Sequence, residues 1–299
     1  MKKNRKIFIQ FGICIVVISV AGILINNLTI NLIRTGLGFD FNWLFQPASF
    51  ALAEHPLPYS SSDSYAWALL IGWLNSLKVI FSSLILATIL GTLIGFARTG
   101  QNSLINIISA GYITIIRQTP LLLQLMFWYF IGFLGLKENI FFHIKNIFKI
   151  SNQGIEVSGL TLSSEFSALL FGLGIFTSAY IAEIIRGGII SVPKEQWEAF
   201  RSLGLSEKKG LISIIFPQAL PAIIPGLTSQ YLNLAKNSTL AIAVGYSDIY
   251  AINDTIINQT GRAIECFIIL LTSFLLLNLL ISNSMEIINK IIINSRKYS

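Results

Sequence analysis

Two groups of polar side chains lie within apolar stretches of the sequence and have the chemistry to bind a small zwitterion. They consist of Arg117, Gln118 and Gln124, and of Asn233, Lys236, Asn237, Ser238 and Thr239. At the centre of a membrane helix a Lys costs about 2.5–3.5 kcal/mol, whereas each Leu regains only about 0.3–0.6 kcal/mol. The first group flanks Pro120, and the second follows Pro217, Pro221 and Pro225, which we expect to interrupt a helix over 218–245. Polar groups beside broken helices can hold a carboxylate or an ammonium group, so both are candidate parts of a substrate pathway.

Each group also has a structural alternative. Arg117 and Lys236 could face the aqueous interface, and the Asn and Ser side chains could hydrogen-bond from helix to helix. Glu183 lies three residues before Arg186, and we interpret these two as a structural ion pair.

Residue types that support catalysis or metal binding are sparse. His55 and His143 lie in loop-like segments, and neither has a second ligand at helical spacing. Cys14 and Cys266 each lie inside an apolar run, and we interpret both as buried small hydrophobic residues. The sequence holds no G-x-x-x-x-G-K-[ST] motif and no Gly-Lys pair, so we expect no nucleotide site. We therefore predict no catalytic residue, metal or cofactor, and no enzymatic activity in this chain.

One charged stretch stands apart from its apolar surroundings. Beginning at Pro193, it reads PKEQWEAFRSLGLSEKKG. Proline suits the first turn of a helix and glycine its end, so we expect a short helix that finishes at Gly204. A second helix is expected over 207–216, capped by Ser206 and stopped by Pro217. The predicted unit is a helix, a glycine hinge and another helix.

The first helix of this unit has two distinct faces in the sequence. The apolar face is predicted to hold Trp197, Phe200 and Leu203, and the polar face the ion pairs Lys194–Glu198 and Glu198–Arg201. Two interpretations remain open: a folded loop whose aromatic face packs on the rest of the chain, or a plug for a groove on a partner.

The elements that position these groups are transmembrane helices. Of the 299 residues, 54% are hydrophobic and only 12% are charged, against about 25% in a soluble domain. An all-α, polytopic membrane protein is predicted, and a β-barrel is not, because the apolar runs are long and do not alternate. Six spans are expected: Ile7–Leu28, Val79–Ala97, 120–136 after a separate helix over 103–117, Phe166–Ile185, an irregular fifth region over 218–245, and Ile264–Met285.

The basic residues predict the orientation. Lys2, Lys3, Arg5 and Lys6 place the N-terminus in the cytoplasm, and six crossings return the basic C-terminal tail to the same side. The charged stretch then faces the cytoplasm, and segments 29–66 and 137–163 face outward. The net charge of +7 is explained by these loops, so nucleic-acid binding is not expected. The first span is interpreted as a retained signal anchor, not as a cleaved signal peptide.

The charged stretch resembles the signature of permeases from ATP-binding-cassette importers, which reads E-A-A, three residues, G, nine residues, I, any residue, L-P. The matching positions are Glu198, Ala199, Phe200, Gly204, Ile214, Phe216 and Pro217, with Phe200 and Phe216 replacing the family's Ala and Leu. Segments 117–130 and 232–249 resemble the polar-amino-acid branch. Segments 31–41, 57–75 and 258–265 resemble the general L-amino-acid subgroup.

This resemblance implies a type I importer transmembrane domain of about six helices in a bacterial inner membrane. Residues 1–66 would form an anchor helix and a periplasmic segment, 67–290 the permease domain with its coupling segment at 191–217, and 291–299 a cytoplasmic tail. The implied partners are a cytoplasmic ATPase dimer, a second and non-identical permease, a periplasmic amino-acid-binding protein and membrane lipid. The residues from Glu198 to Pro217 that match the signature, with Trp197, would couple the chain to the ATPase.

Two other functions were weighed. An ion-driven secondary amino-acid transporter would need paired repeats of broken helices and isolated acidic residues within spans, and the sequence shows neither. A membrane-embedded enzyme would need a catalytic dyad or a carboxylate pair within a span, which is also missing from the sequence.

Overall fold

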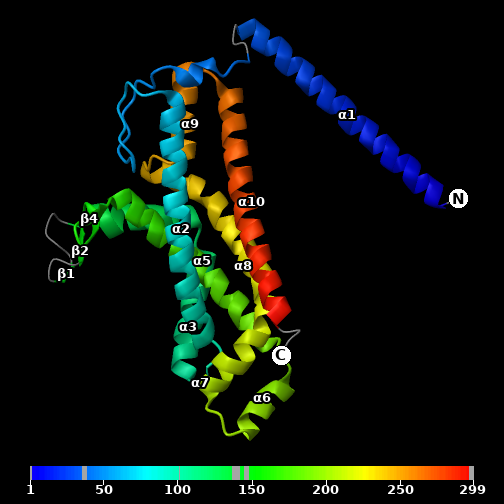
Figure 1. Ribbon diagram of the computed structural model, residues 1–299, viewed down its shortest axis with the longest axis vertical. Coiled ribbons are helices and arrows are strands. Elements are labelled where there is room, and N and C mark those ends of the chain that lie inside the picture. The colour runs from blue at the N-terminus through cyan, green and yellow to red at the C-terminus, as the bar shows by residue number, and fades with distance from the viewer. Residues whose placement is uncertain (1, 36–38, 101, 137–141, 145–147, 296–299) are drawn as a thin grey trace.

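Long apolar runs of the sequence form long helices in the computed structural model, which describes residues 2–35, 39–100, 102–136, 142–144 and 148–295. The helices of ten or more residues are α1 (Lys2–Thr35), α2 (Tyr65–Ala97), α3 (Ser103–Gln118), α5 (Ser164–Ile190), α8 (Phe216–Asn237), α9 (Ile249–Thr260) and α10 (Ala263–Ser295). Shorter ones are α4 (Leu121–Met126), α6 (Lys194–Ser202) and α7 (Glu207–Gly210). In Figure 1 the bundle has α9 at one end and α6 with α7 at the other, and these are called here the α9 end and the α6 end.

The centre of the bundle is the packing of α2 against α5. Gly91 and Gly95 lie one turn apart on α2. A Cβ added at Gly91 would lie 2.6 Å from Ile181 on α5, and one added at Gly95 would lie 2.9 Å from Ile185. Small residues at this spacing let two helix backbones approach closely, which is a common way to pack membrane helices. Both elements carry a buried apolar core, to which α8 and α10 add further side chains.

The predicted spans are present, with shifted boundaries. In the part of the chain that the structure describes, five helices are long and apolar enough to cross a membrane: Ile9–Asn31, Tyr65–Ala97, Ser164–Ile190, Glu207–Val244 and Ala263–Asn294. The third predicted span is the apolar helix Leu121–Leu134, which is shorter than the other five. It is separated from α3 at Thr119–Pro120, where the sequence predicted a break.

The expected interruption of the fifth region by prolines is wrong. The chain is helical without a break from Glu207 to Val244, and Pro221 and Pro225 lie inside α8. A stretch of wider π turns over Leu211–Ile215 comes directly before Pro217. Such turns make room for the proline ring, which would otherwise clash with the carbonyl of the preceding turn. Regular α geometry is lost again at Ser238–Val244, a 3-10 segment called η4, which ends at Gly245 with φ of +77°.

A small β-sheet was not predicted. Its antiparallel strands run in the order β1 (Phe142–Ile144), β2 (Phe148–Ser151), β3 (Gly154–Val157) and β4 (Leu160–Leu162). Ser158 and Gly159 both have positive φ and form the tight turn between β3 and β4. A Ser-Gly pair between short alternating runs is a hairpin signal, and the prediction of an outward polar loop overlooked it.

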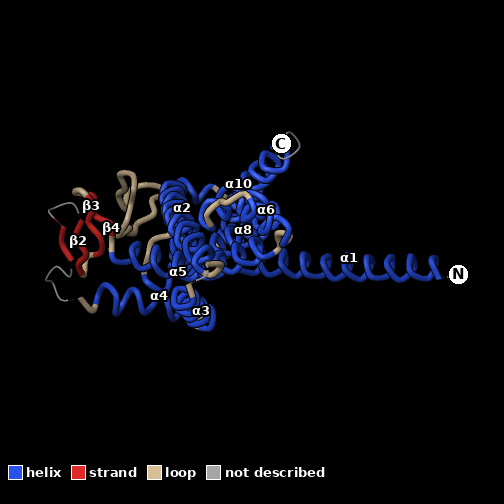
Figure 2. Tube along the Cα trace, turned by 90° about the horizontal axis from the view of Figure 1, so that it is seen from below, coloured by secondary structure: helices blue, strands red, loops and turns tan. Residues whose placement is uncertain are grey.

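Helix α1 stands apart from the bundle. Figures 1 and 2 show that it leaves from the α9 end and points away from the other helices. None of its apolar window is buried, and Cys14 is exposed. The interpretation of Cys14 as a buried residue is therefore wrong, because no helix among the described residues covers α1, whereas Cys266 is buried on α10.

Candidate functional site

The charged stretch folds as a helix, a hinge and a second helix at the α6 end, as the sequence predicted, but Pro217 does not stop the second helix, which continues into α8 (Figure 1). Pro193 precedes the first turn of α6, and the chain reverses at Gly204, where φ is +70°. This left-handed conformation costs other residues roughly 1–2 kcal/mol, which explains the glycine. Ser206 precedes α7 as predicted, but its side chain makes no capping hydrogen bond.

Phe200 anchors the first helix to the rest of the chain. Its side chain is only 1% exposed, and its ring lies 5.9 Å from the ring of Trp197, centroid to centroid. The ring covers Gly210 so closely that a Cβ built there would lie 2.3 Å from Phe200 Cδ2. The large side chain that replaces the family's Ala is therefore accommodated inside this chain by the glycine opposite it.

Two details of the predicted faces are wrong. Leu203 lies beyond the end of α6 and is 75% exposed, so it does not share the buried face of Trp197 and Phe200. Arg201 pairs across the hinge with Glu207, with 2.7 Å between Nε and Oε1, and not with Glu198. This hydrogen bond raises the pKa of Arg201. Neither predicted pair forms within the described segment, and for Arg201 the reason is that the reversal at Gly204 brings Glu207 closer.

The rest of the signature connects this segment to the bundle. Ile214 is half-buried in the wide turns, and Phe216 packs against Phe96 at the end of α2, with ring centroids 4.9 Å apart. The amide of Gln218 donates to the side chain of Gln196 at 3.1 Å, which joins α8 to α6. Glu198 and Ala199 remain exposed on the outer face of α6. The segment therefore presents a polar surface outward, while the aromatic ring of Phe200 is packed inside the chain.

The first polar group is divided by the structure. Gln124 is buried, and its Nε2 donates to the carbonyl oxygens of Ile116 at 2.8 Å and Thr119 at 3.1 Å. It therefore satisfies backbone groups at the break before Pro120. Arg117 and Gln118 line a separate cavity between α2, α3 and α5. The guanidinium of Arg117 lies 4.9 Å from the ring centre of Tyr180.

The second polar group surrounds the change from α8 to η4. Ser238 is buried and donates to the carbonyl of Ala235 at 2.8 Å, and Thr239 donates to the carbonyl of Lys236 at 2.9 Å. Asn233 and Lys236 are exposed and Asn237 is half-buried. Helix α4 packs against η4, and both pack on α5, so the predicted break at Pro120 lies beside the change from α to 3-10 geometry at Ser238.

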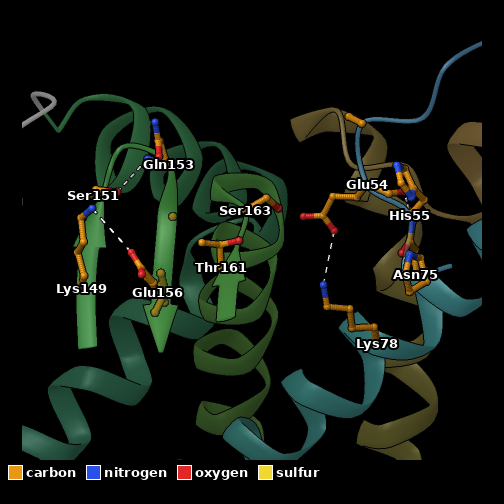
Figure 3. A pocket seen from close by; sticks show the side chains of 14 residues that line it. Glu54, His55, Asn75, Lys78, Lys149, Ser151, Gln153, Glu156, Thr161 and Ser163 are labelled. Carbon is orange, nitrogen blue, oxygen red and sulfur yellow. Dashed lines mark hydrogen bonds and ion pairs between the residues drawn. The ribbon is translucent and has the colours of Figure 1, made fainter. Parts of the chain in front are cut away.

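A third polar region, which the sequence did not reveal, lies between the sheet and the start of α2. Figure 3 shows a cavity with Glu54, His55, Asn75 and Lys78 on one side and strand residues on the other. Its volume is about 530 Å³. Lys78 lies 3.6 Å from Glu54, and Lys149 lies 3.7 Å from Glu156. Only the tertiary approach of segments far apart in sequence brings these side chains together.

The α9 end is tied together beside this cavity. The Asn75 amide donates to the carbonyls of Glu54 at 3.0 Å and Ser247 at 2.8 Å. Asp248 caps α9, because its Oδ1 accepts from the N–H of Ala251 at 2.8 Å. It is 1% exposed, and this burial raises the pKa of Asp248 to about 7.

The structural pair Arg186–Glu183 is confirmed. Glu183 accepts from Arg186 at 2.9 and 3.0 Å, and Arg98 approaches its other oxygen at 3.8 Å. Across the described residues, no three His, Cys, Asp or Glu side chains are grouped as metal ligands would be.

Comparisons with known proteins agree with this architecture. A family described as "binding-protein-dependent transport system inner membrane component" matches residues 84–293. The putative amino-acid ABC transporter permease protein YhdX of Escherichia coli (strain K12) is 33% identical over 92% of this chain and 91% of its own length. The general L-amino acid transport system permease protein AapQ of Rhizobium johnstonii is 31% identical over 96% of this chain and 92% of its own.

Solved structures show the same fold. An amino acid ABC transporter crystallised with histidines superposes with a TM-score of 0.60 and 28% sequence identity, covering 76% of this chain and 94% of its own. An inward-facing structure of the MetNI methionine ABC transporter gives a TM-score of 0.58 over 76% of this chain and 96% of its own. Its identity is 18%, so that second likeness concerns the fold alone.

Proposed function

Because the chain belongs to the family of binding-protein-dependent transport system inner membrane components, we propose that it is the permease subunit of an ATP-binding-cassette importer for L-amino acids. It is a multi-pass membrane protein with the helical fold of type I importer permeases. The family matches support this function over ion-driven secondary transport. The amino-acid cargo rests on the relatives' names and on the histidines of the solved transporter.

An importer permease works with an ATPase and a substrate-binding protein. In finer detail, two ATPase subunits bind at the α6 end, a periplasmic amino-acid-binding protein docks at the α9 end, and a non-identical permease completes the membrane unit. The membrane is the bacterial inner membrane, with the α6 end in the cytoplasm. The basic residues of segments 194–209 and 290–297 support this orientation.

The observation that carries this proposal is the build of α6. An exposed polar face with Glu198 and Ala199 is fixed to the bundle by the buried Phe200. A load applied to the outer face of such a helix reaches α8 through Gly210 and the wide turns that follow it. Closure of the ATPase therefore displaces α8 as a lever, whereas a loosely held loop would absorb the motion.

The pathway for the amino acid is assigned to the region where α4 meets η4. The break before α4 lies beside the 3-10 turns of η4 there, and such departures from α geometry free backbone dipoles that can hold a carboxylate or an ammonium group. Asn233, Lys236 and Asn237 supply exposed or half-exposed polar groups on the same stretch. Ser238, Thr239 and Gln124 fix the backbone at the breaks.

The cavity beside Lys78 and Lys149 suits the arrival of a zwitterion. Both of its ion pairs are long, at 3.6 and 3.7 Å, and both lysine side chains are 37% exposed. Exposed pairs of this kind are worth little, so an amino acid can exchange its own charged ends for either partner. We assign this cavity to the entrance of the importer.

The test is purification of the chain with its neighbours, followed by Glu198→Lys. A stoichiometric ATPase is expected with the wild-type chain, and charge reversal on the exposed face of α6 is expected to lower both ATPase retention and amino-acid uptake. Glu286→Lys is the matched control, because Glu286 is exposed on α10, outside the segment. Normal uptake and ATPase retention by Glu198→Lys would overturn the coupling role.

A further inference from the structure

A cavity of about 420 Å³ lies near the α6 end, between the last turn of α2 and the helices α3 and α5. The polar groups on its wall are Arg98, Thr114, Arg117, Gln118, Tyr180 and Glu183. Arg98 directly follows the span Tyr65–Ala97, so the cavity lies at the depth where the hydrocarbon region ends. None of these side chains belongs to the coupling segment.

The cavity has an excess of positive charge. Glu183 accepts a hydrogen bond from Arg186 Nε at 3.0 Å and forms an ion pair with Arg186 Nη2 at 2.9 Å, whereas Arg98 reaches it only at 3.8 Å. The Nε of Arg98 is buried and has no hydrogen-bond partner among the described residues. Arg117 contributes a second guanidinium, stacked on Tyr180. Three arginines beside one carboxylate leave two positive charges at this site.

The surface next to the cavity is apolar. On α3, Leu104 and Ile108 are each 72% exposed and Ile115 is 66% exposed. Figure 2 shows α3 at the edge of the bundle, and its contacts are mainly with α5. The basic pocket suits the phosphate of a phospholipid, and the apolar wall that leads away from it suits the acyl chains.

We propose that this cavity binds the phosphate of an anionic phospholipid in the leaflet at the α6 end, with the acyl chains along α3. The guanidinium groups of Arg98 and Arg117 are the donors for the phosphate oxygens, because arginine forks match phosphate geometry. Thr114 and Gln118 can hydrogen-bond a polar headgroup such as glycerol. Basic pockets between membrane helices are common sites for anionic headgroups.

The experiment measures lipid retained by the purified full-length chain in mild detergent, by native mass spectrometry after titration with dioleoyl-phosphatidylglycerol or dioleoyl-phosphatidylethanolamine. We expect one tightly held phosphatidylglycerol on the wild type and about fivefold weaker retention in Arg117→Gln, while Arg117→Lys retains most of it. Lys290→Gln, which removes an exposed charge on α10, is the matched control and is expected to behave as the wild type. Arg98→Gln is a second variant, judged only if it remains monodisperse, since Arg98 also bonds Asn106.

Three results would overturn the proposal. These are equal retention of phosphatidylglycerol by Arg117→Gln and Lys290→Gln, equal retention of the two lipids by the wild type, and displacement of phosphatidylglycerol by equimolar inorganic phosphate. The last result would assign the cavity to a soluble anion. Lipid retention is independent of uptake, so its failure leaves the importer function untouched, and the reverse also holds.

Discussion

The two ends of the bundle are held together in different ways. At the α9 end, side chains join segments about two hundred residues apart, as when Tyr65 donates to Gln259 at 3.2 Å and Arg262 donates to the carbonyl of Asp40 at 3.3 Å. At the α6 end, the projecting segment is fixed mainly by the packing of Phe200. The α9 end is therefore a cross-linked frame, whereas the segment at the α6 end depends on one buried ring, that of Phe200.

The largest effect is expected when the Phe200 ring is removed. Phe200→Ala leaves a cavity that costs about 3–5 kcal/mol, so ATP hydrolysis is expected to continue while uptake falls steeply. Gly210→Ala alone is also expected to impair uptake, because its Cβ would lie 2.3 Å from the Phe200 ring. The double variant should lose less than the sum of the two, as measured by a double-mutant cycle on thermal stability. Strict additivity would show that the two residues do not share one contact.

A smaller effect is expected at the hinge. Gly204→Ala keeps open space around its Cβ and meets only the strain of a positive φ, roughly 1–2 kcal/mol, so most uptake is expected to remain. Gly204→Pro cannot adopt φ of +70°, so α6 cannot fold back, and uptake is expected to be lost. Uptake assays on equally expressed variants compare the two. Equal activity would mean that the reversal at Gly204 is not needed.

At the α9 end, loss of a cross-link should lower stability more than transport. Asn75→Ala leaves two half-buried carbonyls without their shared donor and is expected to cost about 1–3 kcal/mol in the stability of the fold. The control is Asn258→Ala, since this exposed amide donates only to Asp254 within its own helix. Thermal unfolding in detergent reports the difference. If Asn75→Ala melted like the control, the frame at this end would not depend on that link.

The smallest effect concerns pH at the same end. The ordinary pKa of Asp248 is 3.8, and burial raises it to about 7 in the folded chain. Between these values the folded chain keeps a proton that the unfolded chain releases, so stability is highest below pH 4 and declines toward pH 7. Asp248→Asn keeps an oxygen for the N–H of Ala251 and is expected to flatten this decline. Melting midpoints at pH 5 and pH 8 give the slope, and an unchanged slope in the variant would exclude Asp248 as its source.

Most of the helical architecture could be predicted because each span is a long apolar run with its own signal. The break at Thr119–Pro120 and the hinge at Gly204 were predictable for the same local reason. The failures involve competition with neighbours that the sequence does not display. Pro221 and Pro225 were expected to interrupt a helix, but packing on α5 and α10 keeps α8 continuous.

The candidate sites divide along the same line. The helix–hinge–helix of the coupling segment follows from the local sequence pattern, whereas the contacts that its side chains make within the chain do not. Arg201 pairs with Glu207 and not with Glu198 because of the chain reversal. The cavity beside Lys78 exists only because the sheet approaches residues 53–56. Arg117 and Gln118 lie near Gln124 in sequence but line a different cavity, since the break at Pro120 turns the chain between them.

The contact between Phe200 and Gly210 also constrains how such a chain can diverge. A bulky ring at position 200 is tolerated only when position 210 carries no side chain. In a mutational path from an ancestor with alanine at 200, glycine at 210 therefore has to be present before the ring. Once the ring is in place, the glycine can no longer be replaced without loss. Related chains are then expected to inherit positions 200 and 210 as a pair, so the pair marks the lineages in which this packing has become fixed.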